Sequence, residues 1–111
     1  MKVRFAIAPH AETPSGPQLL AFGHALEASG FDRIWLSDLP LRPSLDPLLG
    51  LALLAGVTER LRLGANVVPL GRNPFLLAKA LAQLDQISEG RLLLSFVTGI
   101  AQPQEREALW K

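Results

Sequence analysis

Three polar residues lie at, near or just after the carboxyl end of an apolar run that is typical of a β-strand: Asp38, Asn66 and Thr98. A carboxylate, an amide and a hydroxyl can hydrogen-bond a small molecule. In α/β folds the sites form where parallel strands end, so we expect all three residues on one rim. Two alternatives stay open. Asp38 could be a turn residue that accepts backbone hydrogen bonds, and Thr98 could belong to a plain strand-to-helix turn.

The two histidines have different expected positions. His10 lies in the proline-rich segment 9–17, which follows the first expected strand and therefore belongs to the same rim. We predict that His10 contacts substrate; the alternative is a solvated loop histidine. His24 lies off the apolar stripe of its expected helix and is predicted at the surface. No catalytic residue can be named, because the chain has no P-loop, G-x-G-x-x-G, H-E-x-x-H or serine nucleophile elbow.

Alternating strands and helices must position these residues. The apolar runs predict strands at 3–8, 32–38, 61–68 and 91–97, and helices at 18–29, 47–58 and 74–88. Short loops between them indicate an α/β fold with a parallel sheet. A closed (β/α)8 barrel takes about 250 residues, so 111 residues predict a parallel half-barrel, a single domain over 1–111.

The stretch from 61 to 99 predicts one complete βαβ unit. Asn73 is a candidate N-cap, and Pro74 suits the first helical position. Gly90 follows the helix, where a left-handed cap favours glycine. A buried stripe is predicted from spacings of three and four residues, consisting of Leu77, Leu81, Leu84 and Ile87.

The helix at 47–58 has almost no polar face. Asp46 and Pro47 are placed to begin it. A helix that is apolar all round is normally buried on several sides, whereas a sheet covers only one. The last strand also has no following strand to cover its edge. We therefore expect contact with a partner, a second copy or further chain, and predict a homodimer or higher oligomer.

Composition narrows the function classes. The net charge is +1 without a lysine or arginine cluster, and only seven residues are aromatic, which argues against nucleic-acid binding. The chain has no cysteine, so a disulfide framework and a cysteine-based metal site are excluded, and no metal ligand set is predicted. No segment approaches the ~20 apolar residues of a membrane span. These features favour a cytoplasmic protein without a membrane partner.

Four segments together resemble the luciferase-like monooxygenase family, which includes flavin- and deazaflavin-dependent oxidoreductases. They are LRLGANVVPL at 61–70, the P-x-x-x-A-K frame at 74–79, LDQISEGRLLL at 84–94 and FVTG at 96–99. The segment WLSD at 35–38 resembles the family's W-x-S-D-H pattern, but Leu39 replaces the histidine that often lies beside the deazaflavin. The end of the fourth strand is closer to the alkanesulfonate monooxygenase branch.

The resemblance implies the first four strands of a TIM-barrel-like fold, truncated relative to the family. It implies reduced FMN as cofactor, or alternatively the deazaflavin coenzyme F-420, with a small organic substrate. The cofactor-binding candidates are Asp38, Asn66, Val67, Thr98 and Gly99. Family members often have a nonprolyl cis peptide at this bulge, which makes Asn66–Val67 the candidate bond. Thr98 could hydrogen-bond a flavin edge or a phosphate, and Gly99 would allow close backbone approach.

Three hypotheses follow. The first is a flavin-dependent oxidoreductase or monooxygenase, or its amino-terminal half. The second is a non-catalytic half-barrel completed by self-association or by another chain. The third is an unrelated small α/β domain, for example a flavodoxin-like one, which a five-stranded sandwich would indicate.

Overall fold

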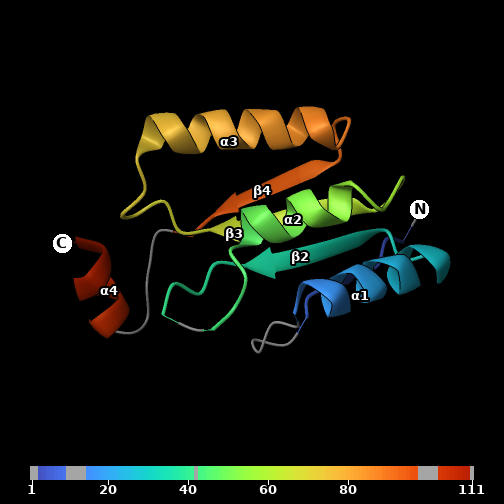
Figure 1. Cartoon of the computed structure of the whole chain (residues 1–111), viewed down its shortest axis with the longest axis horizontal. Helices are drawn as coiled ribbons and strands as arrows, with labels where there is room; N and C mark the ends of the chain where they lie inside the picture. Colours follow the sequence, from blue (N-terminus) through green and yellow to red (C-terminus); the bar gives the residue numbers. More distant parts are fainter. Residues whose placement is uncertain (1–2, 10–14, 42, 98–102, 111) are drawn as a thin grey trace.

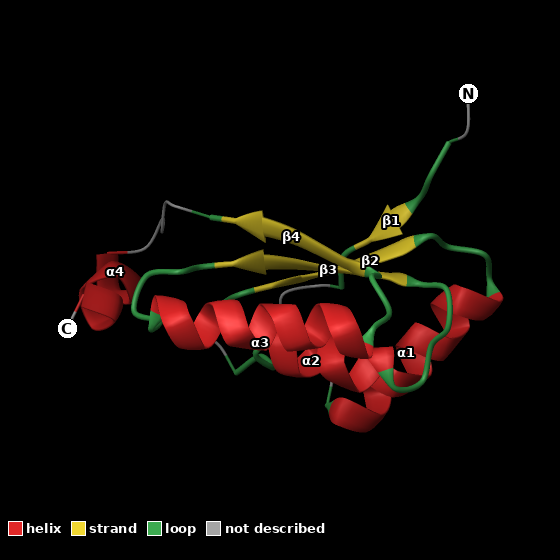
Figure 2. Ribbon diagram, turned by 90° about the horizontal axis from the view of Figure 1, so that it is seen from above, coloured by secondary structure: helices red, strands yellow, loops and turns green. Residues whose placement is uncertain are grey.

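Four parallel strands form one sheet in the order β1-β2-β3-β4. Figure 1 shows β2, β3 and β4, and Figure 2 also shows β1. The computed structural model describes residues 3–9, 15–41, 43–97 and 103–110. The strands are β1 (Ala6–Ile7), β2 (Arg33–Ser37), β3 (Arg62–Val67) and β4 (Leu92–Phe96); the helices are α1 (Gly16–Ala28), α2 (Pro47–Ala55), α3 (Pro74–Ile87) and α4 (Pro103–Trp110). The predicted parallel α/β fold and the parallel pairing of β3 with β4 are confirmed.

All of α1, α2 and α3 lie against one face of the sheet (Figure 2). Leu63, Ala65 and Val67 of β3 point to this face and are fully buried. They form the core together with buried leucines from all three helices. Residues at the alternate positions of each strand point to the opposite face, which no helix of the described residues covers (Figure 2). We call this the open face.

Local cap chemistry explains where two helices begin. The Asp46 carboxylate accepts the backbone N–H of Leu48 at 2.9 Å and of Leu49 at 3.4 Å. The Asn73 side chain does the same for Phe75 at 3.0 Å and Leu76 at 3.2 Å. Each cap satisfies donors that have no partner inside the helix. Both predicted caps are confirmed, as is the left-handed Gly90 with φ 80°.

The apolar helix α2 packs on β2 and β3 and lies between α1 and α3 (Figure 1). Leu51 and Leu54 are fully buried, whereas Leu49 is 69% exposed on the other side. The prediction that this helix would have an uncovered apolar side is confirmed for the described residues.

Two predicted boundaries and one stripe residue need correction. The helix predicted at 47–58 ends at Ala55. The first strand is only Ala6–Ile7 instead of 3–8. The backbone N–H of Phe5 donates to the Asp32 side chain, with Phe5 N and Asp32 Oδ2 3.1 Å apart, so Phe5 does not extend the ladder. Ile87 is 60% exposed and does not belong to the buried stripe of α3. At about 100° per residue, Ile87 is rotated by roughly 80° from Leu77 and by roughly 120° from Leu81.

At the amino ends of the strands, the Glu27 carboxylate binds three successive backbone N–H groups. Its Oε2 lies 3.1 Å from Glu59 N, 2.9 Å from Arg60 N and 2.8 Å from Leu61 N. Burial opposes ionisation, but these hydrogen bonds and the Arg60 charge outweigh it and lower the pKa of Glu27. The carboxylate therefore ties the end of α1 to the loop that enters β3.

Arg91 has a similar role between α2 and α3. Its guanidinium donates to the carbonyl oxygens of Ala55 at 3.1 Å, Leu61 at 3.1 Å and Ser88 at 2.8 Å, and to the Thr58 hydroxyl at 2.8 Å. A cation at the carboxyl ends of two helices satisfies carbonyls that have no intrahelical partner. These contacts fix the helix ends at the end of the sheet opposite the rim.

Candidate functional site

A row of uncharged polar side chains lies where β2, β3 and β4 end. The strand register pairs Ser37 with Asn66 and Asn66 with Ser95, so the three side chains share the open face. Asn66 Nδ2 lies 3.3 Å from Ser37 Oγ. Asn66 was predicted here, but both serines were missed. The two-residue alternation along each strand places each serine on one face of the sheet. Aligning them with Asn66 also requires the register between the strands, which the sequence does not give.

Below this row the open face is apolar. Trp35 and Leu93 are partly buried, and Gly64 lies between them in the register. A Cβ at Gly64 would overlap the indole ring of Trp35, so the ring lies directly over this glycine. The open face therefore has a flat aromatic surface below a polar row.

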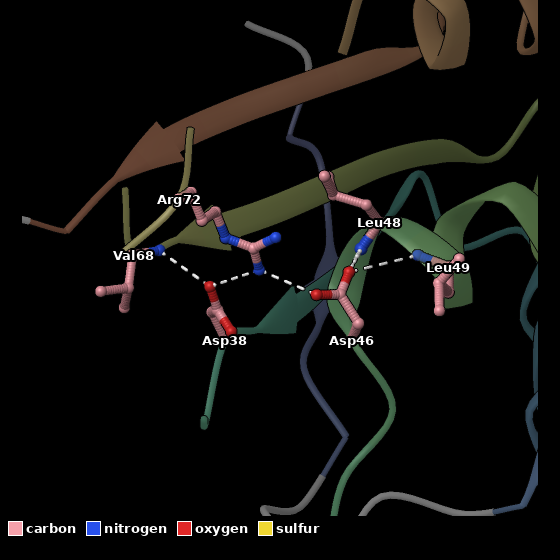
Figure 3. A network of polar contacts seen from close by, with 6 residues as sticks. All are labelled: Asp38, Asp46, Leu48, Leu49, Val68 and Arg72. Atoms are coloured by element: carbon pink, nitrogen blue, oxygen red, sulfur yellow. Dashed lines mark hydrogen bonds and ion pairs between the residues drawn. The ribbon is translucent and has the colours of Figure 1, made fainter. Parts of the chain in front are cut away.

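Asp38 follows Ser37 but its carboxylate is occupied by the protein itself (Figure 3). Oδ2 accepts the backbone N–H of Val68 at 3.1 Å and Arg72 Nη2 at 2.8 Å. The Asp38 N–H donates to the Asn66 carbonyl at 2.9 Å. With its side chain only 8% exposed, Asp38 ties the end of β2 to the loop after β3. These contacts favour the turn-type alternative for its carboxylate.

Arg72 joins two carboxylates of that loop region. Its Nη2 lies 2.8 Å from Asp38 Oδ2 and 2.8 Å from Asp46 Oδ2 (Figure 3). Burial opposes the charged form, but the hydrogen bonds and the charges of both aspartates outweigh it and raise the pKa of Arg72. Because Asp46 also caps α2, this network positions the β2–α2 loop against the β3–α3 loop beside the polar row. Sequence reasoning missed Arg72, which lies in a turn far from both partners in the sequence.

The predicted cis peptide at Asn66–Val67 is wrong: the bond is trans, like every peptide bond that the structure describes. Both residues stay in the β3 ladder, paired with Ser95 and Phe96, and extended pairing requires a trans chain. The Val67 side chain points to the helices and is fully buried. Only its backbone could contact a ligand on the open face.

The remaining candidates divide into two groups. His10, Thr98 and Gly99 lie outside the described residues. His24 is exposed on α1, as predicted.

Over 3–9, 15–41, 43–97 and 103–110, no group of three or more histidine and acidic side chains could hold a metal ion. Among the same residues, no helix is both long and apolar enough to cross a membrane.

The polar row at the carboxyl ends of parallel strands is the usual site position of a (β/α) barrel. The luciferase-like monooxygenase family model matches residues 1–108, and the chain belongs to this family. A protein of Mycobacterium tuberculosis is 43% identical over 77 residues, 68% of this chain and 22% of that protein. A pyrimidine monooxygenase of Methylobacterium radiotolerans is 41% identical over 58 residues, 51% of this chain and 15% of that protein.

Solved structures share the fold. The oxygenating constituent of 3,6-diketocamphane monooxygenase from Pseudomonas putida, in complex with FMN, superposes with a TM-score of 0.86 at 22% identity, covering 98% of this chain and 33% of that one. The coenzyme F-420-dependent tetrahydromethanopterin reductase from Methanopyrus kandleri superposes with a TM-score of 0.82 at 24% identity, covering 97% of this chain and 30% of that one. A monooxygenase from Streptomyces bottropensis superposes with a TM-score of 0.82 at 30% identity, covering 96% of this chain and 36% of that one.

The four strands are therefore the amino-terminal part of a TIM-barrel-like luciferase fold, as the sequence predicted. The chain spans 22% of the length of its mycobacterial relative and 30–36% of the length of these three solved chains. The third hypothesis, an unrelated flavodoxin-like domain, does not hold, because the sheet of the described residues has four strands and the fold matches barrels instead.

Proposed function

We propose that this chain is the amino-terminal part of a flavin-dependent oxidoreductase, in which a flavin-type cofactor lies across the open face at the polar row. One observation carries the proposal: the register aligns Ser37, Asn66 and Ser95 on the face that no described helix covers. The FMN complex and the F-420-dependent enzyme among the structural relatives support the cofactor class.

The described residues suit such a group. A flavin ring is flat, with an apolar body and a polar edge, and the open face offers Trp35 and Leu93 below hydroxyl and amide groups. When bound, the cofactor would supply the redox chemistry, for which the protein supplies binding and orientation. The Asn66 amide could donate to or accept from the polar edge, and the two serine hydroxyls could do the same.

The rest of the chain would position these groups. Asp38 and Arg72 hold the two loops beside the row, so we assign them a positioning role. Thr98 and Gly99 remain proposed cofactor contacts, and His10 a proposed substrate contact. Reduced FMN with oxygen and a small organic substrate is our first choice, because Leu39 stands where the deazaflavin branch often has histidine. A cytoplasmic location remains part of the proposal.

An FMN titration followed by 15N NMR tests the cofactor position. We expect the largest shifts at the amides of Asn66, Ser37 and Ser95, and no shift at Arg60, at the opposite end of β3. The variant Asn66→Ala should weaken binding about tenfold, and Gln83→Ala, on the exposed side of α3, should leave it unchanged. Shifts at the Arg60 end, or equal weakening in both variants, would contradict the proposal. A parallel titration with F-420 compares the two cofactors.

A second candidate function is a non-catalytic half-barrel completed by self-association or by another chain. The uncovered face of α2, with Leu49 exposed, favours it. Under this alternative the chain holds flavin poorly, gives no detectable turnover with reduced FMN and forms a dimer or larger species. A monomer that binds FMN at micromolar affinity would contradict it.

A further inference from the structure

A hollow of about 340 Å³ lies at the amino ends of β2 and β3, the opposite end of the sheet from the polar row. Four arginines line it, and two acidic residues share it; they are Arg4, Arg33, Arg60, Arg62, Glu27 and Asp32. We call it the arginine hollow. Neither the family likeness nor the proposed flavin position gives it a role.

The charges in the arginine hollow do not balance. Four guanidinium groups face two carboxylates, which leaves two positive charges unmatched. Both carboxylates are already used: Glu27 accepts three backbone N–H groups, and Asp32 Oδ2 accepts the N–H of Phe5 at 3.1 Å. Within the described residues, no ion pair is formed by any of the four arginines, in contrast to Arg72.

One arginine also has a buried donor without a partner. Arg33 Nε is shielded from solvent and makes no hydrogen bond within the described part of the chain. Buried donors are normally satisfied, so an unpaired one suits an acceptor supplied by a bound molecule. Arg33 and Arg62 are register partners, so their guanidinium groups start from neighbouring backbone positions. Adjacent guanidinium forks match the oxygens of a phosphate group.

We propose that the arginine hollow binds a multiply charged oxyanion, specifically a diphosphate or a phosphate ester. A single carboxylate would neutralise only half of the unmatched charge. The volume of about 340 Å³ corresponds to roughly ten water molecules, which is enough for a diphosphate group. Arg33 and Arg62 hold the oxyanion, and Arg4 and Arg60 contribute charge at its rim.

Isothermal titration of the chain with sodium diphosphate, at ionic strength held constant with sodium chloride, tests this site. We expect saturable binding with one site per chain. Arg33→Gln and Arg62→Gln should each weaken it at least about tenfold. Lys79→Gln removes the same charge from the exposed side of α3 and should change affinity less than about twofold, so it separates a local site from a net-charge effect.

A second readout protects against variants that fail to fold. In the unchanged protein, the Arg33 Nε–Hε resonance should shift on addition of diphosphate, while that of Arg91, which donates to Ser88, should not. Parallel titrations with diphosphate and ribose 5-phosphate distinguish a free anion from an ester. The proposal would be overturned if no saturable binding were observed, or if Lys79→Gln lowered the affinity as much as the arginine variants do. It would also be overturned if the arginine variants altered only self-association, which would indicate an acidic protein surface as the occupant.

Discussion

The Glu27 carboxylate and the Leu61 amide nitrogen lie 2.8 Å apart, although 34 positions separate these residues in the sequence. Glu27→Gln keeps an acceptor but removes its charge. Hydrogen bonds to charged groups contribute about 1.5–3 kcal/mol, and this carboxylate is partly exposed. We therefore expect the free energy of unfolding, measured in urea at pH 7, to fall by about 1–2 kcal/mol.

The same contact predicts a pH dependence. The pKa of Glu27 is lower in the fold than its ordinary value of 4.5, so the carboxylate stabilises the protein above that value. The stabilisation is lost as the pH falls through the folded pKa. The difference between the wild type and Glu27→Gln should thus shrink below pH 4.5. Glu59→Gln, an exposed neighbour, is the control and should show less than about 0.5 kcal/mol at either pH.

The second prediction concerns the coupling between Arg72 and Asp38. Arg72→Gln leaves a nearly buried carboxylate without its cation, so we expect a loss of about 2–3 kcal/mol. Asp38→Asn in the Arg72→Gln background should recover part of that loss. A double-mutant cycle by urea unfolding should give a coupling energy of about 1–3 kcal/mol. Additive single effects would show that the 2.8 Å contact contributes nothing to stability.

The third prediction tests the close approach of Trp35 to Gly64. Gly64→Ala introduces a methyl group into the volume of the indole, so the ring must move or the fold must give way. We expect a loss of about 1–3 kcal/mol and a changed Trp35 emission, measured with Trp110→Phe so that one tryptophan remains. The control is Gly56→Ala, because Gly56 has space for a methyl group and an ordinary negative φ. This variant should change neither the free energy of unfolding nor the Trp35 emission.

The fourth prediction is self-association. Phe75 is 77% exposed on α3 and Leu49 is 69% exposed on α2. A groove of about 410 Å³ between α3 and β4 is lined by Leu77, Leu81 and Phe96, among others. Light scattering should give a mass above the monomer that rises with concentration. Phe75→Gln together with Leu49→Gln should lower it, whereas Gln83→Glu should not. A monodisperse monomer of the unchanged chain would contradict this expectation.

The sequence predicted what depends on nearby residues. The caps Asp46 and Asn73 act on N–H groups two and three positions away, so spacing alone revealed them. It did not reveal contacts that need the folded register. Glu27, Arg72 and Arg91 were missed because their partners lie up to 36 positions away in the sequence. Ile87 was misassigned because a four-turn helix drifts from a stripe based on steps of three and four.

The strand order β1-β2-β3-β4 also has a kinetic meaning. Each strand pairs with the strand formed just before it, so no pairing waits for a distant part of the chain. Local pairing lowers the entropy lost on loop closure and favours fast folding. During synthesis on the ribosome, each new βα unit can therefore add to a sheet that already exists, with Arg91 closing the βαβ unit as β4 emerges.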